Sequence, residues 1–348
     1  MKLMENVPLA AHTTLGVGGP GRFWVEVNTE AELPEALAWA TERGLPVLAL
    51  GAGSNLLVAD CGYDGLVLRL ALRGVRELGA GRLLAAAGED WDGLAANCVA
   101  RGWAGVECLS GIPGSVGATP VQNVGAYGQA VAESIVRVRA WDRQNRDWAE
   151  LTVGECGFGY RCSRFNGADR GRFLITAVEF ALRPGGAPTL RYPELRQRVP
   201  AGASLAEVRE AVRGLRRGKA MLLDPEDQDA RSAGSFFKNP VLSAAQAAAV
   251  AARSDGAAPP QFPEPGGGTK FPAAWLIERA GFAKGFRLPA SSIRLSRKHV
   301  LALVNEGHGT AAQAAALALH IRSTVETRWG VRLEMEPVAV GFTPGELD

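Results

Sequence analysis

One glycine-rich segment near the middle of the chain constrains the fold more than any other part of the sequence. Residues 111–128 read GIPGSVGATPVQNVGAYG and contain five glycines and two prolines. They cannot form a regular helix or a central strand, because glycine loses backbone entropy there and proline removes a hydrogen-bond donor. The only strongly polar side chains are Gln122 and Asn123. We therefore predict a loop against a planar or anionic group, with glycine amides and carboxamides as donors. A tight structural loop beneath a sheet is the alternative.

A second glycine-rich segment, 51–55 (GAGSN), lies between apolar runs at 46–50 and 56–58. It joins strand to strand, and its backbone amides, hydroxyl and carboxamide can surround a pyrophosphate. Residues 16–21 match Gly-x-Gly-x-x-Gly in letters. A dinucleotide fingerprint must open a helix, however, whereas the alternating run at 22–27 predicts a strand. The sequence therefore predicts two cofactor loops without a Rossmann unit.

Length and charge are those of an ordinary two-domain protein. The chain has 348 residues, more than the roughly 100–200 of a typical domain. A formal charge of +2 does not call for nucleic acid or a membrane surface as a partner. Arginines are concentrated in 191–217, where a solvated helical face and a binding patch both remain open.

Cysteines and histidines indicate a reducing compartment and no metal. The five cysteines form no Cys-x-x-Cys pair, and no two of the four histidines have metal-ligand spacing. The N-terminus lacks a long apolar region, and no window reaches the ~18 apolar residues of a membrane span. We expect a soluble cytoplasmic protein.

Hydrophobic periodicity predicts an α+β chain whose second domain begins near residue 204. Ser204 and Glu207 form a capping box, and Thr29 caps an earlier helix. Glu334 and Glu336 are expected on one face of the last strand. The four prolines and four glycines of 254–270 predict a mobile surface loop. Expected helices are 29–43, 91–100, 204–217, 243–252, 272–280 and 310–328, and expected strands include 22–27, 46–50, 56–58, 136–141, 147–151, 173–182, 299–304 and 331–340.

No single motif in the sequence identifies the function. Ser115 and Ser235 do not lie in Gly-x-Ser-x-Gly, which argues against a serine hydrolase. Arg161 follows Gly159 and Tyr160, and a surface ion pair is the ordinary role of such an arginine. From the residues alone, the chain is a two-domain α+β protein with a glycine-loop cofactor site.

Five ordered blocks resemble the UDP-N-acetylenolpyruvoylglucosamine reductase family (UDP-N-acetylmuramate dehydrogenase, MurB), in its longer form with a tyrosine-bearing loop. The resemblance covers nearly the whole chain. The blocks are 51–55 (GAGSN), 112–114 (IPG) with 122–128 (QNVGAYG), 160–161 (YR), 234–240 (GSFFKNP) and 333–336 (LEME).

The resemblance implies a flavoenzyme of peptidoglycan synthesis, and hence of cell wall biogenesis, cell shape and cell division. NADPH would reduce a non-covalent FAD, and the enolpyruvyl ether of UDP-N-acetylglucosamine would become UDP-N-acetylmuramic acid. The implied fold is a two-lobed FAD-binding domain of the vanillyl-alcohol-oxidase/PCMH type, not Rossmann, plus a C-terminal α+β substrate domain. The expected FAD-binding region is 1–203, with lobes 1–69 and 70–203 rejoined by 331–348, and the substrate-binding domain is 204–330. We expect a monomer with a small-molecule substrate and neither nucleic acid nor membrane as partner.

The resemblance also implies individual roles. Arg161 would lie near the enolpyruvyl carboxylate, Ser235 would donate a proton, and Glu336 would be the catalytic glutamate. Contacts to the UDP-sugar fall on Tyr192, Arg216, Lys219 and Asn239. Cofactor contacts fall on Gly51, Ala52, Gly53, Ser54, Asn55, Pro113, Gly114, Gly117, Ala118, Gln122, Asn123, Gly125 and Ile175. Two departures from the family pattern are Ala118, where relatives have Ser or Gly beside the flavin, and Met335, where Pro is common.

These residue types suit the chemistry. Charge builds on the substrate carboxylate as hydride adds, and a fixed guanidinium can stabilise it in bidentate geometry. The adjacent carbon then needs a positioned proton donor.

Two other classes of protein remain open as alternatives. A carbohydrate oxidase on the same FAD fold would keep both loops without a serine donor, often with FAD tethered through His or Cys. A non-catalytic flavin or nucleotide-binding module would lose Arg161, Ser235 and Glu336 as a set.

Overall fold

The computed structural model describes residues 1–254, 258–264 and 266–347. The chain divides into two compact units that interleave in sequence. Unit 1 comprises Met1–Val7, Gly21–Gly53 and Asp64–Leu222, and unit 2 comprises Pro8–Pro20, Ser54–Tyr63 and Leu223–Asp348. These units divide the chain differently from the expected boundary at residue 204 and the expected lobes 1–69 and 70–203. The assignment of FAD and substrate to separate domains stays a prediction.

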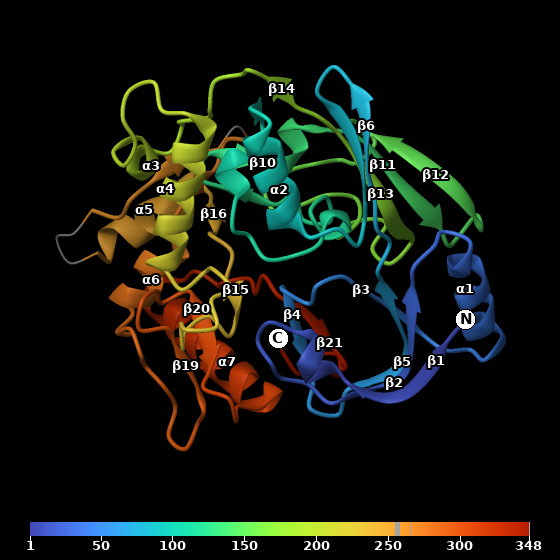
Figure 1. Cartoon of the computed structure of the whole chain (residues 1–348). Coiled ribbons are helices and arrows are strands. Elements are labelled where there is room, and N and C mark those ends of the chain that lie inside the picture. Colours follow the sequence, from blue (N-terminus) through green and yellow to red (C-terminus); the bar gives the residue numbers. More distant parts are fainter. Residues whose placement is uncertain (255–257, 265, 348) are drawn as a thin grey trace. The chain divides into compact units, whose positions relative to one another are not determined.

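Unit 1 contains two larger sheets, besides two pairs of very short strands. The first has the strand order β1-β2-β5-β3, with β3 parallel to β5, and its end residues Pro8, Pro20 and Tyr63 belong to unit 2. The second has the order β12-β11-β13-β7-β6 and is antiparallel (Figure 1). The strands are β1 (Leu3–Pro8), β2 (Pro20–Val27), β3 (Val47–Leu50), β5 (Tyr63–Leu70), β6 (Val75–Gly79), β7 (Arg82–Ala86), β11 (Ile135–Asp142), β12 (Asp147–Thr152) and β13 (Phe173–Ala181).

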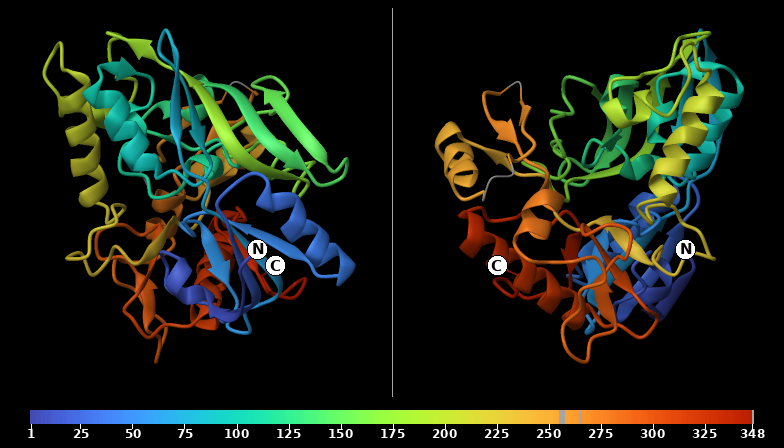
Figure 2. Two further views of the ribbon diagram at one scale, coloured as in Figure 1. Left: turned by 45° about the vertical axis from the view of Figure 1, so that its right-hand side comes forward. Right: turned by 90° about the vertical axis from the view of Figure 1, so that its left-hand side faces the viewer.

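The helices of unit 1 pack on these sheets and on the glycine-rich segment 111–128, called the central loop below. Trp91 and Leu94 of α2 belong to the same buried cluster as Val138 and Val178 of the second sheet. Helix α4 lies beside α2 in both Figure 1 and Figure 2. The helices are α1 (Glu32–Glu42), α2 (Trp91–Ala100), α3 (Pro193–Arg196) and α4 (Leu205–Arg217), with 3-10 turns η2 (Glu107–Leu109), η3 (Val116–Ala118) and η4 (Val131–Glu133) and two-residue strand pairs β8 (Trp103–Ala104) with β14 (Arg183–Pro184) and β9 (Gly125–Ala126) with β10 (Gln129–Ala130).

Unit 2 is built from helices and three small sheets. The sheets are β15-β20-β19, β16-β18-β17 and the parallel pair β21-β4. Its elements are η1 (Leu9–His12), β4 (Leu56–Val58), β15 (Ser232–Ser235), β16 (Val241–Leu242), α5 (Ala244–Ala252), β17 (Phe262–Pro263), β18 (Thr269–Lys270), α6 (Ala273–Arg279), β19 (Ile293–Leu295), β20 (Ala302–Asn305), α7 (Ala311–Trp329) and β21 (Val338–Val340).

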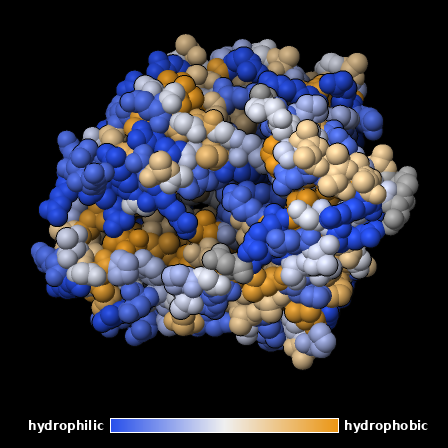
Figure 3. Space-filling view, turned by 180° about the vertical axis from the view of Figure 1, so that it is seen from behind, coloured by the Kyte–Doolittle hydropathy of each residue, from blue (hydrophilic) through white to orange (hydrophobic). Residues whose placement is uncertain are grey.

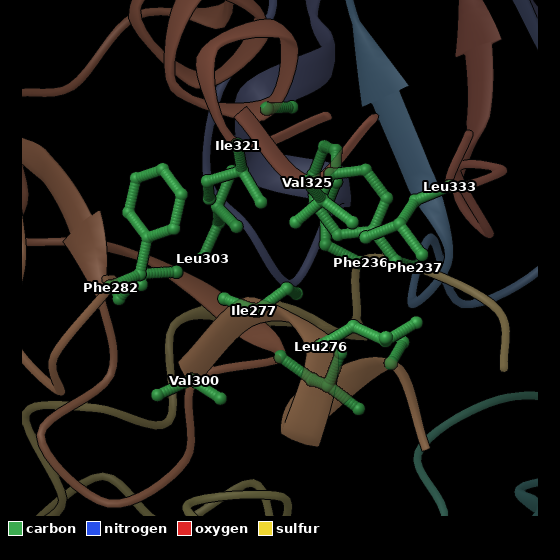
Figure 4. Close-up of a cluster of buried hydrophobic side chains, with 14 of the residues drawn as sticks. Phe236, Phe237, Leu276, Ile277, Phe282, Val300, Leu303, Ile321, Val325 and Leu333 are labelled. Atoms are coloured by element: carbon green, nitrogen blue, oxygen red, sulfur yellow. The ribbon is translucent and has the colours of Figure 1, made fainter. Parts of the chain in front are cut away.

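One hydrophobic cluster holds unit 2 together. Leu303 of β20 packs with Leu276 and Ile277 of α6 and with Ile321 and Val325 of α7 (Figure 4). Residues from the short N-terminal segments join the same cluster, namely Leu15, Val17 and Leu57. The core of unit 2 therefore needs residues that are distant in sequence.

Most expected elements are confirmed, but three differ from the sequence prediction. Helix α1 begins at Glu32, with Ala31 and not Thr29 as its N-cap residue. The turn before it is closed by the Glu32 carboxylate, which accepts the N–H groups of Asn28 and Thr29 at 2.7 and 3.1 Å. The expected strand 331–340 is confirmed only at its end, in β21. Residues 331–336, all of which the structure describes, form no regular strand and are paired only through a single β-bridge of Met335 with Phe237.

The third difference concerns the 254–270 segment. Its described part contains the paired strands β17 and β18. The expectation of a mobile loop also falls on 255–257 and 265, which lie outside the described residues.

On the face shown in Figure 3, hydrophilic residues predominate and hydrophobic ones form separate patches. Among the described residues, no helix is both long and apolar enough to span a membrane.

Candidate active site

The two glycine-rich segments approach each other within unit 1. A Cβ atom added to Gly51 would lie 2.5 Å from Ser115 Oγ and 3.8 Å from the Cβ of Ala118. A Cβ on Gly117 would lie 2.5 Å from that of Ala87. The approach of Gly117 to Ala87 requires glycine, because the Cβ and Cα of Ala87 cannot rotate away. The two loops predicted separately from the sequence therefore lie next to each other in the structure.

The residues of the loops fit a dinucleotide cofactor such as FAD. In the described part of the chain, the backbone amides of residues 51–54 donate no hydrogen bond to another group. Gly53 is buried with a φ of +65°, so its amide is a donor that needs an acceptor. Successive amides of this kind bind phosphate oxygens. Gly51–Gly53, Ser54 and Asn55 would hold the diphosphate, and 113–125 would follow the flavin.

Arg161 occupies an unusual backbone conformation in a tight turn. The N–H of Gly159 donates to the carbonyl of Cys162 at 2.9 Å, and the reverse bond measures 3.3 Å. Arg161 has a φ of +52°, in the left-handed region that few non-glycine residues adopt. Asn166 Nδ2 donates to the Arg161 carbonyl at 3.1 Å, and Asn123 Nδ2 donates to that of Gly159 at 2.9 Å. The central loop thus fixes the turn that carries Arg161.

Asn123 uses its whole carboxamide for this purpose. Its Oδ1 accepts the N–H of Ala132 at 3.2 Å, while its Nδ2 holds the Gly159 turn. The residue itself is left-handed, with a φ of +45°. The structure therefore gives Asn123 a structural task that the sequence did not predict, and its contact with the cofactor stays a prediction.

A cluster of aromatic and cationic side chains forms beside the central loop in unit 1. The rings of Tyr127 and Tyr192 meet edge to face with centroids 5.4 Å apart. Lys219 Nζ lies 5.9 Å from the centre of the Tyr127 ring and 3.3 Å from a carboxylate oxygen of Glu194. Burial raises the pKa of Tyr127 to about 12, so its hydroxyl stays protonated. The structure thus brings together two of the residues expected to contact the UDP-sugar.

Arg216 lies in the same cluster but is only 8 % exposed. Its Nε donates to the carbonyl of Gly111 at 2.9 Å, and one terminal nitrogen donates to that of Met221 at 2.6 Å. Burial and, to a smaller extent, the charge of Arg161 lower the pKa of Arg216. The guanidinium is thus directed at backbone carbonyls, and its expected contact with the UDP-sugar stays a prediction.

Ser235 and Glu336 lie on neighbouring segments of unit 2. Ser235 ends β15, and the N–H of Glu336 donates to the carbonyl of Phe236 at 2.9 Å. Asn55, from the first glycine-rich loop, donates through Nδ2 to the carbonyl of Glu336 at 3.1 Å and accepts the N–H of Val338 at 2.9 Å. The loop predicted for the cofactor is thus bonded directly to the predicted catalytic glutamate.

Buried aromatic rings fix the backbone around Ser235. Phe236 and Phe237 are both fully buried in the unit 2 core (Figure 4). Phe237 forms a single β-bridge with Met335. Its bonds run from the N–H of Glu336 to the carbonyl of Phe236 and from the N–H of Lys238 to the carbonyl of Glu334, both at 2.9 Å, so the bridge does not use the N–H of Met335. Ser235 is therefore carried by a rigid element.

Asn239 has one end of its carboxamide occupied. Its Oδ1 accepts the N–H of Ala273 at 2.9 Å, at the start of α6. Lys238 forms an ion pair with Glu334, whose side chain is 71 % exposed. The two glutamates of 333–336 thus have different surroundings, since Glu336 is partly buried.

The predicted site residues divide between the units as follows. Unit 2 carries Ser54, Asn55, Ser235, Asn239 and Glu336. Ile175 is buried in β13 of unit 1. The other predicted residues of unit 1 are Gly51, Ala52, Gly53, Pro113, Gly114, Gly117, Ala118, Gln122, Asn123, Gly125, Arg161, Tyr192, Arg216 and Lys219.

Sequence reasoning missed two residues that shape these groups. Tyr127 was visible as an aromatic residue inside a glycine-rich loop, a pattern that could have marked it. Thr14 gave no such signal. Its Oγ1 donates to the carbonyl of Ser232 at 2.6 Å and lies 3.4 Å from that of Ser54, contacts that are 218 and 40 residues apart in sequence.

Comparison with known proteins identifies the family. A family model described as "FAD binding domain" matches residues 22–146, and one described as "UDP-N-acetylenolpyruvoylglucosamine reductase, C-terminal domain" matches 224–340. The UDP-N-acetylenolpyruvoylglucosamine reductase of Nocardia farcinica is 51% identical over 346 residues, which cover 97% of this chain and 89% of that protein. The chain belongs to the UDP-N-acetylenolpyruvoylglucosamine reductase family.

Further members of the reductase family agree. The reductase of Saccharopolyspora erythraea is 46% identical and covers 95% of this chain and 94% of its own length. The crystal structure of the Thermus caldophilus enzyme matches with a TM-score of 0.67 at 26% identity, covering 97% of this chain and 98% of that one. The expected family, the fold class of an FAD-binding domain with a C-terminal domain, and an oxidoreductase are confirmed.

Proposed function

We propose that this chain reduces the enolpyruvyl ether of UDP-N-acetylglucosamine to UDP-N-acetylmuramic acid, with NADPH as hydride donor. The supporting observation is the hydrogen bond of Asn55 to the carbonyl of Glu336, with Ser235 on the adjoining segment. This hydrogen bond joins the glycine-rich loop 51–55 to the segments that carry Ser235 and Glu336, to which the family resemblance assigns proton transfer. When bound, FAD would accept hydride from NADPH and deliver it to the vinyl carbon of the substrate.

The chain's own residues would handle charge and protons. Asn123 and Asn166 hold the backbone of the turn that carries Arg161. The guanidinium of Arg161 would stabilise the substrate carboxylate as it gains charge. The hydroxyl of Ser235 would donate a proton to the carbon next to that carboxylate, and Glu336 would assist on the neighbouring segment. FAD would be non-covalent, because neither 51–55 nor 111–125 contains His or Cys.

We also propose a cytoplasmic monomer that acts on a small nucleotide sugar, without nucleic acid or membrane partners. The near balance of 38 basic and 36 acidic residues supports the absence of a polyanionic partner. Elution of the purified protein at the mass of a single chain would test the monomer.

Anaerobic flavin spectroscopy tests the function. The purified protein should show flavin absorbance bands that NADPH bleaches and that the enolpyruvyl substrate restores, with the lactyl ether as product. A protein without flavin bands would contradict the proposal. So would a reduced flavin that only molecular oxygen can reoxidise, which is the behaviour of an oxidase.

A further inference from the structure

The first two residues of α2 form hydrogen bonds with the start of the central loop and with the residues just before it. The backbone N–H of Trp91 donates to the carbonyl of Gly114 at 3.1 Å, and its indole Nε1 donates to that of Leu109 at 2.9 Å. Asp92 Oδ1 accepts the N–H of Gly111 at 2.6 Å. Three successive anchors therefore fix where the loop begins.

Gly111 is held on both sides. Asp92 accepts its N–H, while Arg216 Nε donates to its carbonyl at 2.9 Å. Its φ is +72°, and an added Cβ would lie 2.4 Å from Leu222 Cδ2. Because the left-handed conformation sets the direction in which the chain leaves Gly111, these two bonds determine the path of the residues that follow.

Helix α4 provides the charges for this arrangement. Arg209 and Arg213 contact the two oxygens of Asp92 at 2.6 and 2.8 Å, and Arg216 lies one turn further on. Burial opposes ionisation of Asp92, but hydrogen bonds from Arg209 and Gly111 outweigh it and lower its pKa. Of the two interpretations left open for the arginines of 191–217, a solvated face does not describe these three, because they contact Asp92 and Gly111.

Residues 115–117, which are predicted to face the cofactor, follow Gly111 by only a few positions. The N–H of Val116 donates to the carbonyl of Glu89 at 2.9 Å, and that of Gly117 to Ala87 at 2.9 Å. Ser115, between them and Gly111, is the residue that Gly51 approaches. A change at Gly111 would therefore move the surface that faces the cofactor.

We propose that Asp92 and Arg216 are positioning residues that clamp Gly111 and thereby hold 112–118 in the conformation that binds FAD. Neither acts by touching FAD; each acts through the backbone of Gly111. The clamp rests on the proposed function only in that 112–118 is taken to contact FAD.

The test compares Asp92→Ala with Glu210→Ala in the full chain. Glu210 is a matched control, because it pairs with the same Arg213 at 3.7 Å from an exposed position and does not contact Gly111. Apo-protein is titrated with FAD by flavin fluorescence. We expect FAD binding about 10-fold weaker or more in Asp92→Ala, as when supporting residues of a site are lost, and within about twofold of the parent in Glu210→Ala. Equal affinities in the two variants would overturn the proposal.

Arg216→Lys provides a second arm should Asp92→Ala fail to fold. A single ammonium cannot reproduce the planar guanidinium that joins Gly111 to Met221. Amide exchange of 111–118 in the apo-protein should be faster in Arg216→Lys than in Glu210→Ala, and unchanged exchange would contradict the clamp. If the parent protein binds no FAD, the proposed function fails, whereas the exchange comparison still decides whether the clamp exists.

Discussion

The hydroxyl of Ser235 is small and weakly acidic, but its backbone is firmly placed. Gly234 before it has a φ of +73°, and Ser235 itself pairs with Ala302 of β20. The ring of Phe236 after it is fully buried. A serine held in this way can serve as a proton donor, since placement matters more than acidity when the acceptor is a strongly basic carbon.

We expect Ser235→Ala to slow only the second half-reaction. Flavin bleaching by NADPH should stay near the parent rate, while reoxidation by the enolpyruvyl substrate should fall by about 10²–10⁴. Rapid mixing measures both steps, and Ser235→Cys should recover part of the rate because a thiol can also donate. If bleaching slows as much as reoxidation, Ser235 is structural and Glu336 becomes the candidate donor.

Gly117 tests the close approach of the central loop to Ala87, the residue that follows β7. An alanine there would place its Cβ 2.5 Å from the Cβ and 3.0 Å from the Cα of Ala87, atoms that cannot rotate away. We expect Gly117→Ala to lose FAD and about 1–3 kcal/mol of unfolding free energy. Gly154→Ala is the control, because nothing lies within 4 Å of its added Cβ. Denaturant unfolding with and without FAD measures both effects, and equal stability of the two variants would contradict this packing.

The roles of residues could be predicted where the residue types of one short segment carry the signal. The glycines of 51–55 and 111–128 indicated a cofactor site because their backbone freedom is itself the signal. The tasks of Asn123 and Arg216 could not be predicted, since a carboxamide or guanidinium has the same letter whether it faces a ligand or a carbonyl of its own chain.

At the scale of elements, helix ends were predictable when a local cap existed. Ser204 and Glu207 form the predicted capping box of α4, and Thr310 caps α7 through the N–H of Gln313. Helix α7 also has a cap that is distant in sequence. Asp60 accepts the N–H groups of Ala311 and Ala312 at 2.7 and 2.9 Å. No sequence pattern near α7 indicates this carboxylate.

Asp60 should therefore contribute to the stability of α7. It satisfies two of the helix's free N–H groups and carries a negative charge at the positive end of the helix dipole. We expect Asp60→Ala to cost about 0.5–2 kcal/mol. Asp64→Ala, which removes an exposed ion pair with Arg22, should change stability by less than about 1 kcal/mol. Chemical denaturation compares the two, and an equal loss would show that the cap contributes nothing.

The whole molecule differs from a simple succession of domains. Segments 8–20 and 54–63 leave unit 1 in sequence and join unit 2, where β4 pairs in parallel with β21. Periodicity reveals which face of a strand is apolar but not which strand it will pair with. Periodicity placed a boundary near residue 204, where a helix begins, whereas α4 is held in unit 1 by Asp92, a contact far away in sequence.

Leu57 gives a direct test of this interleaving. It is 1 % exposed and packs in the core of unit 2, although the segments on either side of 54–63 in sequence belong to unit 1. We expect Leu57→Ala to cost about 2–5 kcal/mol through lost burial and a cavity. Hydrogen exchange should then accelerate in β20 and α7 before it does so in β11 and β13. Leu37→Ala, the same substitution in a unit 1 core, should give the opposite order. Each variant should first accelerate exchange in the core that it weakens. If exchange accelerates first in the same elements in both variants, the two cores do not unfold as separate cooperative regions.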